Sequence, residues 1–406
     1  MALLGVGNRI ILCTALSTTA GWINRLAVPL VVYNISRSPI ATSLAFAAAH
    51  LPPITVGLLS GAIVDRHSAT RLIFAATSLS FLAIMAISWL VTQPHLYVLL
   101  FIFLFINSSL SSVQLPATHV VVVEKFAPEQ RLRINSHLGM VDQLSSVMAP
   151  LATGAAVLLI PAQWLFYLSA CAYLAASMAV LRIHSRERRE FRRVAIHQDI
   201  ARGFRTIKKD RQILACTVLF MFSNFASTLV QSTFVPLTHN RFGASATAVS
   251  VLFATAGLFG IAGHFLARKL VVRSKTAAVV LALTAISGAL TTLMAANLGI
   301  VAFGFFWGVC SLLGCINVTL LSTYRQCVVP PHLVGRSVSA ARFATYLPIP
   351  VAAILSGFAF DRLGGDLLLL ASGTARLLGV VAILVGTFSF SRRTRGAVHP
   401  EKLEAA

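Results

Sequence analysis

Long runs of apolar residues, each about the length of a membrane-crossing helix, alternate along this chain with short polar and charged connections. A helix crosses a bilayer in about 20 residues, because it satisfies its own backbone hydrogen bonds where no water is present. The pattern predicts twelve such helices, at residues 10–33, 40–63, 72–92, 96–120, 136–159, 163–182, 212–237, 245–267, 276–296, 298–324, 337–360 and 367–390. The expected fold class is an all-α membrane protein.

Composition excludes an ordinary soluble domain. The chain is 57% hydrophobic and only 11% charged, with a mean hydropathy of +0.82, and no soluble core could absorb so much apolar surface. The six cysteines stand singly without C-x-x-C spacing, so neither a disulfide framework nor a metal site is indicated. Nothing resembles a nucleotide-binding loop or a catalytic triad, and we expect neither an enzyme nor a bound cofactor.

The net charge of +21 raises the question of a nucleic-acid partner, which would require one exposed basic face. Instead, with the N-terminus inside, about 27 of the 33 Lys and Arg fall in or at the edge of alternate connections on one side of the membrane. This asymmetry follows the positive-inside rule. It predicts an inner-membrane protein with both termini and residues 183–211 in the cytoplasm, and no nucleic-acid partner.

The second half of the sequence repeats the first at a shift of about 203 residues. The matched positions are Pro128 with Pro331, Arg133 with Arg336, Ser136 with Ser339 and Gly154 with Gly357. Such a repeat predicts two pseudo-symmetric six-helix bundles that share a cavity and rock about it. The expected divisions are a bundle at 1–183, a linker at 184–211, a bundle at 212–393 and a cytoplasmic tail at 394–406.

The linker carries Ile200, Phe204 and Ile207 at helical spacing among Arg and Lys. This spacing suits an amphipathic helix lying on the anionic inner leaflet. A simple solvated linker is the alternative, particularly over residues 184–198.

Residues 57–71, GLLSGAIVDRHSATR, place a charged group directly after the second predicted helix. Gly61, Asp65, Arg66 and Arg71 resemble the signature loop of the major facilitator superfamily. The stretches WINRLAVPLVV, HLPPITVGLLSGAIVDR, RINS and RGFRTIKKDRQILA resemble its enterobactin-exporter and macrolide-efflux branch. The resemblance implies that the loop of Gly61 to Arg71 meets the helix N-terminus near residues 335–337, where Asp65 would latch a cytoplasmic gate.

The stretch SSVMAPLATG, residues 145–154, resembles the antiporter motif of the same superfamily, with Pro150 and Gly154 kept. Small side chains let two helices approach closely, and a proline allows a bend. The motif favours export, although ordinary small-residue packing is an alternative. Two departures weaken the resemblance to proton-coupled relatives: Gly21 replaces an acid common in the branch, and the fourth helix lacks an arginine found in many drug/proton antiporters.

Asp142 is the only acid well inside a predicted helix, where a charge costs upwards of about 3 kcal/mol on insertion scales. Arg25, Arg342 and Arg376 are the basic residues placed within helices. In the repeat register Arg342 lies one turn from the position that matches Asp142, which predicts pairing or electrostatic influence between the two across the cavity. Proton coupling at Asp142 and a purely structural ion pair remain open.

Other polar residues inside the predicted helices would give the cavity mixed polarity. They are Asn24 and Arg25 in the first helix, His50 in the second, Asn107 in the fourth, Gln143 in the fifth, and Asn224 and Gln231 in the seventh. An imidazole titrates in the physiological range, yet His50 beside Pro52 and Pro53 also suits a packing role.

The resulting hypothesis is a monomeric secondary transporter that exports a small amphipathic molecule, a drug or siderophore, by proton antiport. An importer or facilitator of a lipid-like or nutrient solute is the alternative on the same fold. A membrane sensor or scaffold is the alternative from another class.

Overall fold

The computed structural model of this protein describes residues 5–181, 183, 204–267, 276–296, 298–329 and 331–395, and all regular structure in those residues is helical. The long elements of the first half are α1 (Val6–Ser36), α2 (Pro39–His50), α3 (Pro52–Arg66), α4 (Ala69–Leu90), η1 (Pro94–Leu96), α5 (Leu99–Lys125), α6 (Pro128–Leu159) and α7 (Ala162–Val180). Those of the second half are α9 (Arg211–Gln231), α10 (Phe234–Phe242), α11 (Ala246–Ala267), α12 (Thr276–Leu293), α13 (Gly299–Val328), α14 (Pro331–Tyr346) and α15 (Pro348–Arg395).

Every predicted membrane helix coincides with a helix or a kinked helix pair, which confirms the fold class. Nine stretches of the described residues are long and apolar enough to cross a membrane. Helices α1 and α6 are also long but fall outside that set. These two carry Arg25 and Asp142 in their interiors.

Prolines and one glycine explain the breaks within the membrane rods. Pro52 begins α3 directly after α2, and Pro348 begins α15 directly after α14, because proline lacks the N–H that would continue the preceding helix. Gly364 interrupts α15 with φ of 77°, a left-handed conformation that glycine adopts without strain. The chain reverses there, so α15 supplies two membrane rods.

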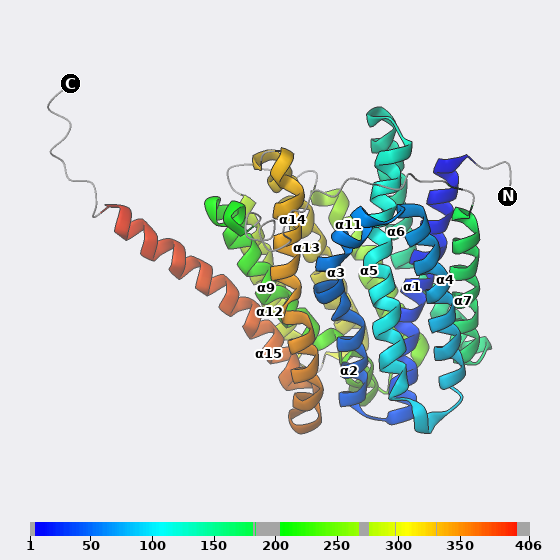
Figure 1. Cartoon of the computed structure of the whole chain (residues 1–406). Helices are drawn as coiled ribbons and strands as arrows, with labels where there is room; N and C mark the ends of the chain where they lie inside the picture. The colour runs from blue at the N-terminus through cyan, green and yellow to red at the C-terminus, as the bar shows by residue number, and fades with distance from the viewer. Residues whose placement is uncertain are drawn as a thin grey trace.

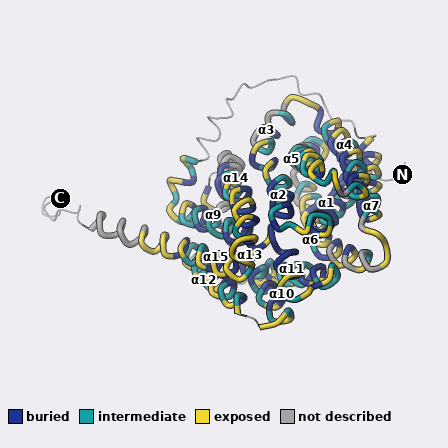
Figure 2. Tube along the Cα trace, turned by 90° about the horizontal axis from the view of Figure 1, so that it is seen from below, coloured by how far each residue is buried: buried dark blue, intermediate teal, exposed yellow. Residues whose placement is uncertain are grey.

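The helices form two groups that lie side by side (Figure 1). Helix α1 packs on α6 and α7, and α4 packs on α5 and α7, whereas α15 packs on α9 and α12, and α11 packs on α13. Seen from below, α2 and α11 lie where the two groups meet (Figure 2). We call the groups α1–α7 and α9–α15 the first and second bundles.

The start of α1 and the end of α15 lie towards the upper side of Figure 1, which we call the termini side. The lower side, with the connections at residues 37–38 and 361–366, is the opposite side. A hydrophobic cluster there joins the bundles: Leu26, Leu30 and Tyr33 of α1 pack with second-bundle residues that include Phe234 and Trp307. Removal of this apolar surface from water holds the bundles together on the opposite side.

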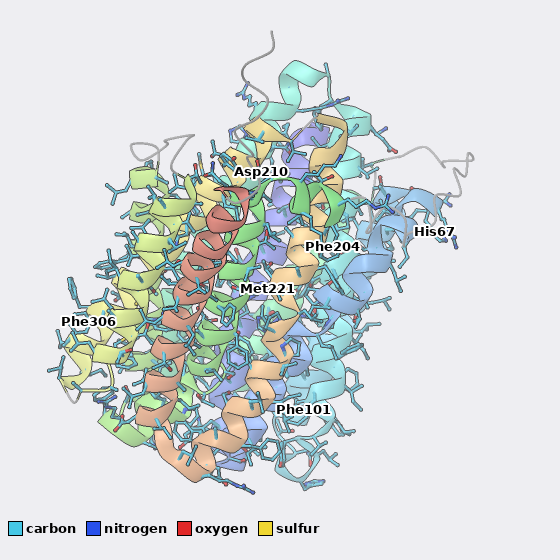
Figure 3. All side chains as sticks on the ribbon, turned by 90° about the vertical axis from the view of Figure 1, so that its left-hand side faces the viewer. His67, Phe101, Phe204, Asp210, Met221 and Phe306 are labelled. Atoms are coloured by element: carbon cyan, nitrogen blue, oxygen red, sulfur yellow. The ribbon has the colours of Figure 1, made fainter. Side chains whose placement is uncertain are left out.

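The structure corrects the expectation that the end of the predicted linker helix lies on the lipid surface. Residues 204–209 are helical, and Ile207 is buried in a cluster with Tyr324, Val329 and Ala340. Phe204, labelled in Figure 3, meets the ring of Phe343 edge to face, with 6.5 Å between centroids. The apolar face of this segment therefore covers protein instead of lipid, while Ile200 lies outside the described residues.

Candidate functional site

The predicted centre of the site, Asp142, lies midway along α6 and faces α1. The indole Nε1 of Trp22 donates a hydrogen bond to Asp142 Oδ1 at 3.4 Å. The guanidinium of Arg25, one turn along α1, lies 4.5 Å from the centroid of the Trp22 ring, within the range of a cation–π contact. Arg25 and Asp142 are both exposed. The tryptophan thus contacts both side chains.

Asp142 also lies on the side of α6 that faces the second bundle. A Cβ on Gly257 of α11 would lie 3.1 Å from Val147 Cγ2 and 3.2 Å from the Ser146 carbonyl oxygen. Ser146 is four residues, or about one helical turn, beyond Asp142, so the two share a face. The carboxylate therefore lies at the interface between the bundles.

His50 of α2 and Asn107 of α5, both predicted site residues, contact aromatic side chains: His50 contacts Phe46, and Asn107 contacts Tyr173 of α7. His50 stacks on Phe46 with 3.9 Å between ring centroids, and its Nδ1 lies 2.8 Å from the Phe46 carbonyl oxygen. Tyr173 is buried and its hydroxyl interacts with Asn107 and Ser111. The stacking and the bond within its own helix support the packing interpretation of His50.

Asn24 does not line the interface. It is buried within the first bundle, and neither atom of its amide has a hydrogen-bond partner among the described residues. The expectation that Asn24 adds polarity to a shared cavity is wrong for this conformation, because α1 turns that side chain inward.

Three of the predicted site residues lie in the second bundle: Arg342, Asn224 and Gln231. Arg342 is exposed, and its guanidinium lies 5.2 Å from the ring centroid of Tyr346. Asn224 Nδ2 donates to the Thr345 carbonyl oxygen at 2.8 Å and ties α9 to α14 near the break before Pro348. Gln231 is exposed at the end of α9.

Asp142 and Arg342 do not form an ion pair here. Among the described residues the partner of Asp142 is Trp22, and the neighbour of Arg342 is Tyr346. Pairing in another conformation of the transport cycle stays a prediction.

The signature loop follows the end of α3, and α3 contacts α14 as the resemblance implies. Arg66 and Arg71 are exposed. The side chains of Gly61, Asp65, Gln143, Pro150 and Gly154 lie outside those that the structure describes, although their backbones lie in α3 and α6. The latch role of Asp65 stays a prediction.

A second close contact between the bundles mirrors that of α6 with α11. A Cβ on Gly357 of α15 would lie 1.9 Å from Ser43 Oγ and 3.0 Å from Ile40 Cα, both in α2. The repeat matches Gly357 with Gly154 of α6. The two interbundle contacts thus involve equivalent segments of the two halves, as the predicted pseudo-symmetry requires.

A hydrogen bond also links the bundles on the opposite side. Tyr33 Oη of α1 donates to Asn240 Oδ1 of α10 at 2.8 Å, and the Tyr33 ring meets His239 edge to face at 5.6 Å between centroids. The sequence pattern gave no reason to pair Tyr33 with Asn240, which lie more than 200 positions apart and are not matched by the repeat. They close the opposite side together with the α2–α15 contact.

Loss of the Tyr33 hydroxyl is expected to favour separation of the two bundles on the opposite side. Tyr33→Phe removes one interbundle hydrogen bond, a net contribution of about 1 kcal/mol, and should raise the separated population about fivefold. Spin labels at Thr92 and Leu363, which lie on the opposite side of the first and second bundles, would report the distance distribution. Tyr97→Phe, also on this side, serves as the control; an equal response to both changes would contradict the assignment.

Sequence reasoning noted Arg376 but missed its partners. This buried residue of α15 donates to Ser227 Oγ of α9 at 2.7 Å and to Ser287 Oγ of α12 at 3.1 Å, and it also donates to Thr291 Oγ1. A buried charge requires such compensation. The network joins three helices of the second bundle through neutral acceptors.

Two facing bundles of membrane helices, with charged side chains between them, define the class as a polytopic helical membrane protein. The chain belongs to the Major Facilitator Superfamily, which it matches over residues 10–353. The family and the structurally similar proteins are transporters, and this chain is a transporter and not an enzyme.

Similar proteins agree on the fold and differ in their solutes. The chain is 27% identical over 165 residues, 40% of its length, to the uncharacterised MFS-type transporter YfiS of Bacillus subtilis (strain 168), and the match spans only 38% of that relative. The nucleoside transporter NupG has a TM-score of 0.76 at 10% identity, covering 94% of this chain and 99% of its own. The D-xylose-proton symporter has a TM-score of 0.71 at 14% identity, covering 93% and 96%.

A bacterial homologue of the human lysosomal transporter Spinster, inward-facing and occupied, has a TM-score of 0.72 at 13% identity, covering 95% of this chain and 97% of its own. At these identities the likeness shows the fold alone.

Proposed function

We propose that this transporter exports a small amphipathic organic molecule, a drug or siderophore, by alternating access and proton antiport. The observation that supports export is the contact of the antiporter-like stretch with the other bundle. Ser146 and Val147 of that stretch lie against Gly257 of α11. Small residues at a helix crossing permit such an approach, and a change in it would move one bundle against the other.

Asp142 is proposed as the coupling carboxylate. It carries a carboxyl group, lies midway along α6 and remains exposed at the interface. A carboxylate whose neighbouring guanidinium approaches in one conformation and withdraws in the other changes its proton affinity with the cycle. Arg342, on the facing bundle, is the proposed guanidinium.

Transport in vesicles tests the proposal. Protein reconstituted with a known orientation should move its solute from the termini side to the opposite side when the opposite side is acidic, and collapse of the pH gradient should stop accumulation. Screening purified protein by thermal shift against drugs, siderophores and lysolipids supplies the solute. Accumulation in the reverse direction under the same gradient would favour the importer.

The membrane orientation is a further part of the proposal. The basic connections support a cytoplasmic termini side in the inner membrane, with the protein acting as a monomer. In a cysteine-free background, His67→Cys after α3 should react with an impermeant maleimide only after lysis, whereas Thr92→Cys after α4 should react in intact spheroplasts. Both positions are exposed. The reversed labelling pattern would overturn the orientation.

A further inference from the structure

Cations outnumber acids in the interior of the membrane helices. Away from the ends of the described membrane rods lie three guanidiniums, those of Arg25, Arg342 and Arg376, and the single carboxylate of Asp142. Charges at that depth are costly unless something compensates them. The distribution leaves positive charge in excess.

Arg25 is held in a way that leaves its hydrogen-bonding edge free. Its guanidinium lies 4.5 Å from the Trp22 ring centroid, and it donates no hydrogen bond to a described residue. A guanidinium over an aromatic face keeps its N–H donors in its own plane, available to a planar acceptor. Arg25 also adjoins Leu26, which packs in the cluster shared with the second bundle.

Arg342 has the same arrangement on the second bundle. It lies 5.2 Å from the Tyr346 ring centroid, is exposed, and donates no hydrogen bond within the described part of the chain. Arg342 lies in α14, which contacts α3 of the first bundle.

Arg376 is not available to a solute. Its donors are taken by Ser227, Ser287 and Thr291, and the side chain is buried. Those neutral partners satisfy its hydrogen bonds but leave its charge uncancelled. Asp142 accepts from an indole and pairs with no guanidinium among the described residues. Neither exposed guanidinium forms an ion pair with a carboxylate of the described residues, so each can receive the carboxylate of a solute.

We propose that the transported solute is an organic anion with an aromatic or amphipathic body, whose carboxylate binds between Arg25 and Arg342. This rests on the proposed function and narrows its substrate class. A carboxylate accepts two parallel hydrogen bonds from one guanidinium. The rings of Trp22 and Tyr346 provide apolar surface beside each binding edge.

Matched pairs of ligands test the charge requirement. Binding of 1-naphthoate and indole-3-acetate to the wild-type protein in nanodiscs should be about ten- to a hundredfold tighter than binding of the corresponding carboxamides. Arg25→Gln and Arg342→Gln should each remove most of that preference, and Arg25→Lys should keep part of it. Arg362→Gln, an exposed arginine of α15 on the opposite side, should leave it unchanged.

Several outcomes would overturn the proposal. They are equal binding of acid and amide, unchanged preference in both glutamine variants of properly folded protein, or no binding by either acid. Thermal unfolding of each variant without ligand shows whether it is folded. A neutral or cationic solute that is nevertheless pumped in vesicles would reject the anion while the exporter stands, whereas absence of any gradient-driven flux would reject the exporter.

Discussion

Asp142→Asn is expected to abolish uphill efflux driven by a pH gradient, down to the level of protein-free vesicles, while downhill exchange continues. The asparagine is nearly the same shape, and its Oδ1 can still accept the hydrogen bond that Trp22 Nε1 donates at 3.4 Å. The substitution therefore removes the charge and the proton-binding group with little change in packing. A permanently neutral side chain cannot carry a proton through the cycle.

A matched variant separates charge from hydrogen bonding. Trp22→Phe removes the donor to Asp142 and keeps both the carboxylate and an aromatic face for Arg25. It should retain uphill transport at a reduced rate. Should the Asn variant still accumulate solute against its gradient, Asp142 is not the coupling group. Equal loss in both variants would instead assign the effect to the Trp22 contact.

Gly357→Ala is expected to drive the protein out of the conformation described here. The new Cβ would lie 1.9 Å from Ser43 Oγ and 3.0 Å from both Ile40 Cα and Ser43 Cβ. Rotation of the serine can relieve only the first contact, so α15 and α2 must separate. Overpacking of this kind costs about 1–3 kcal/mol, which corresponds to a population shift of about five- to more than a hundredfold.

Distances between spin labels at Thr92 and Leu363 would show this shift as a longer component of the distance distribution. Transport should also fall, because the bundles can no longer close together on the opposite side. Ser43→Ala combined with Gly357→Ala should restore part of both. Gly139→Ala in α6 is the control, because a Cβ there meets nothing within 4 Å. Unchanged distances in Gly357→Ala would show that the α2–α15 contact does not hold this state.

The sequence was sufficient for the helices and the symmetry because both leave local signals. Apolar length gave the membrane spans, and the shift that matched Gly154 with Gly357 gave the two-bundle hypothesis. The depth of Asp142 likewise marked it as a candidate for the site. These inferences needed no knowledge of how the helices are rotated.

The rotation of each helix about its own axis explains which contacts the sequence did not predict. A membrane helix is apolar on most of its surface, so periodicity does not fix which face turns inward. Asn24 was therefore expected at the interface and is buried, whereas Trp22 emerged as the partner of Asp142 only in three dimensions. The pair of Tyr33 and Asn240 depends on the arrangement of both bundles.

The Arg376 network has a consequence for how the protein is made. During membrane insertion an unsatisfied arginine at the centre of a helix costs about 2.5–3.5 kcal/mol. The hydroxyls that receive its N–H groups belong to Ser227, Ser287 and Thr291, all synthesised before α15 leaves the ribosome. The last membrane rod can thus enter the bilayer against α9 and α12 already in place, and its charge is transferred to waiting acceptors instead of to lipid.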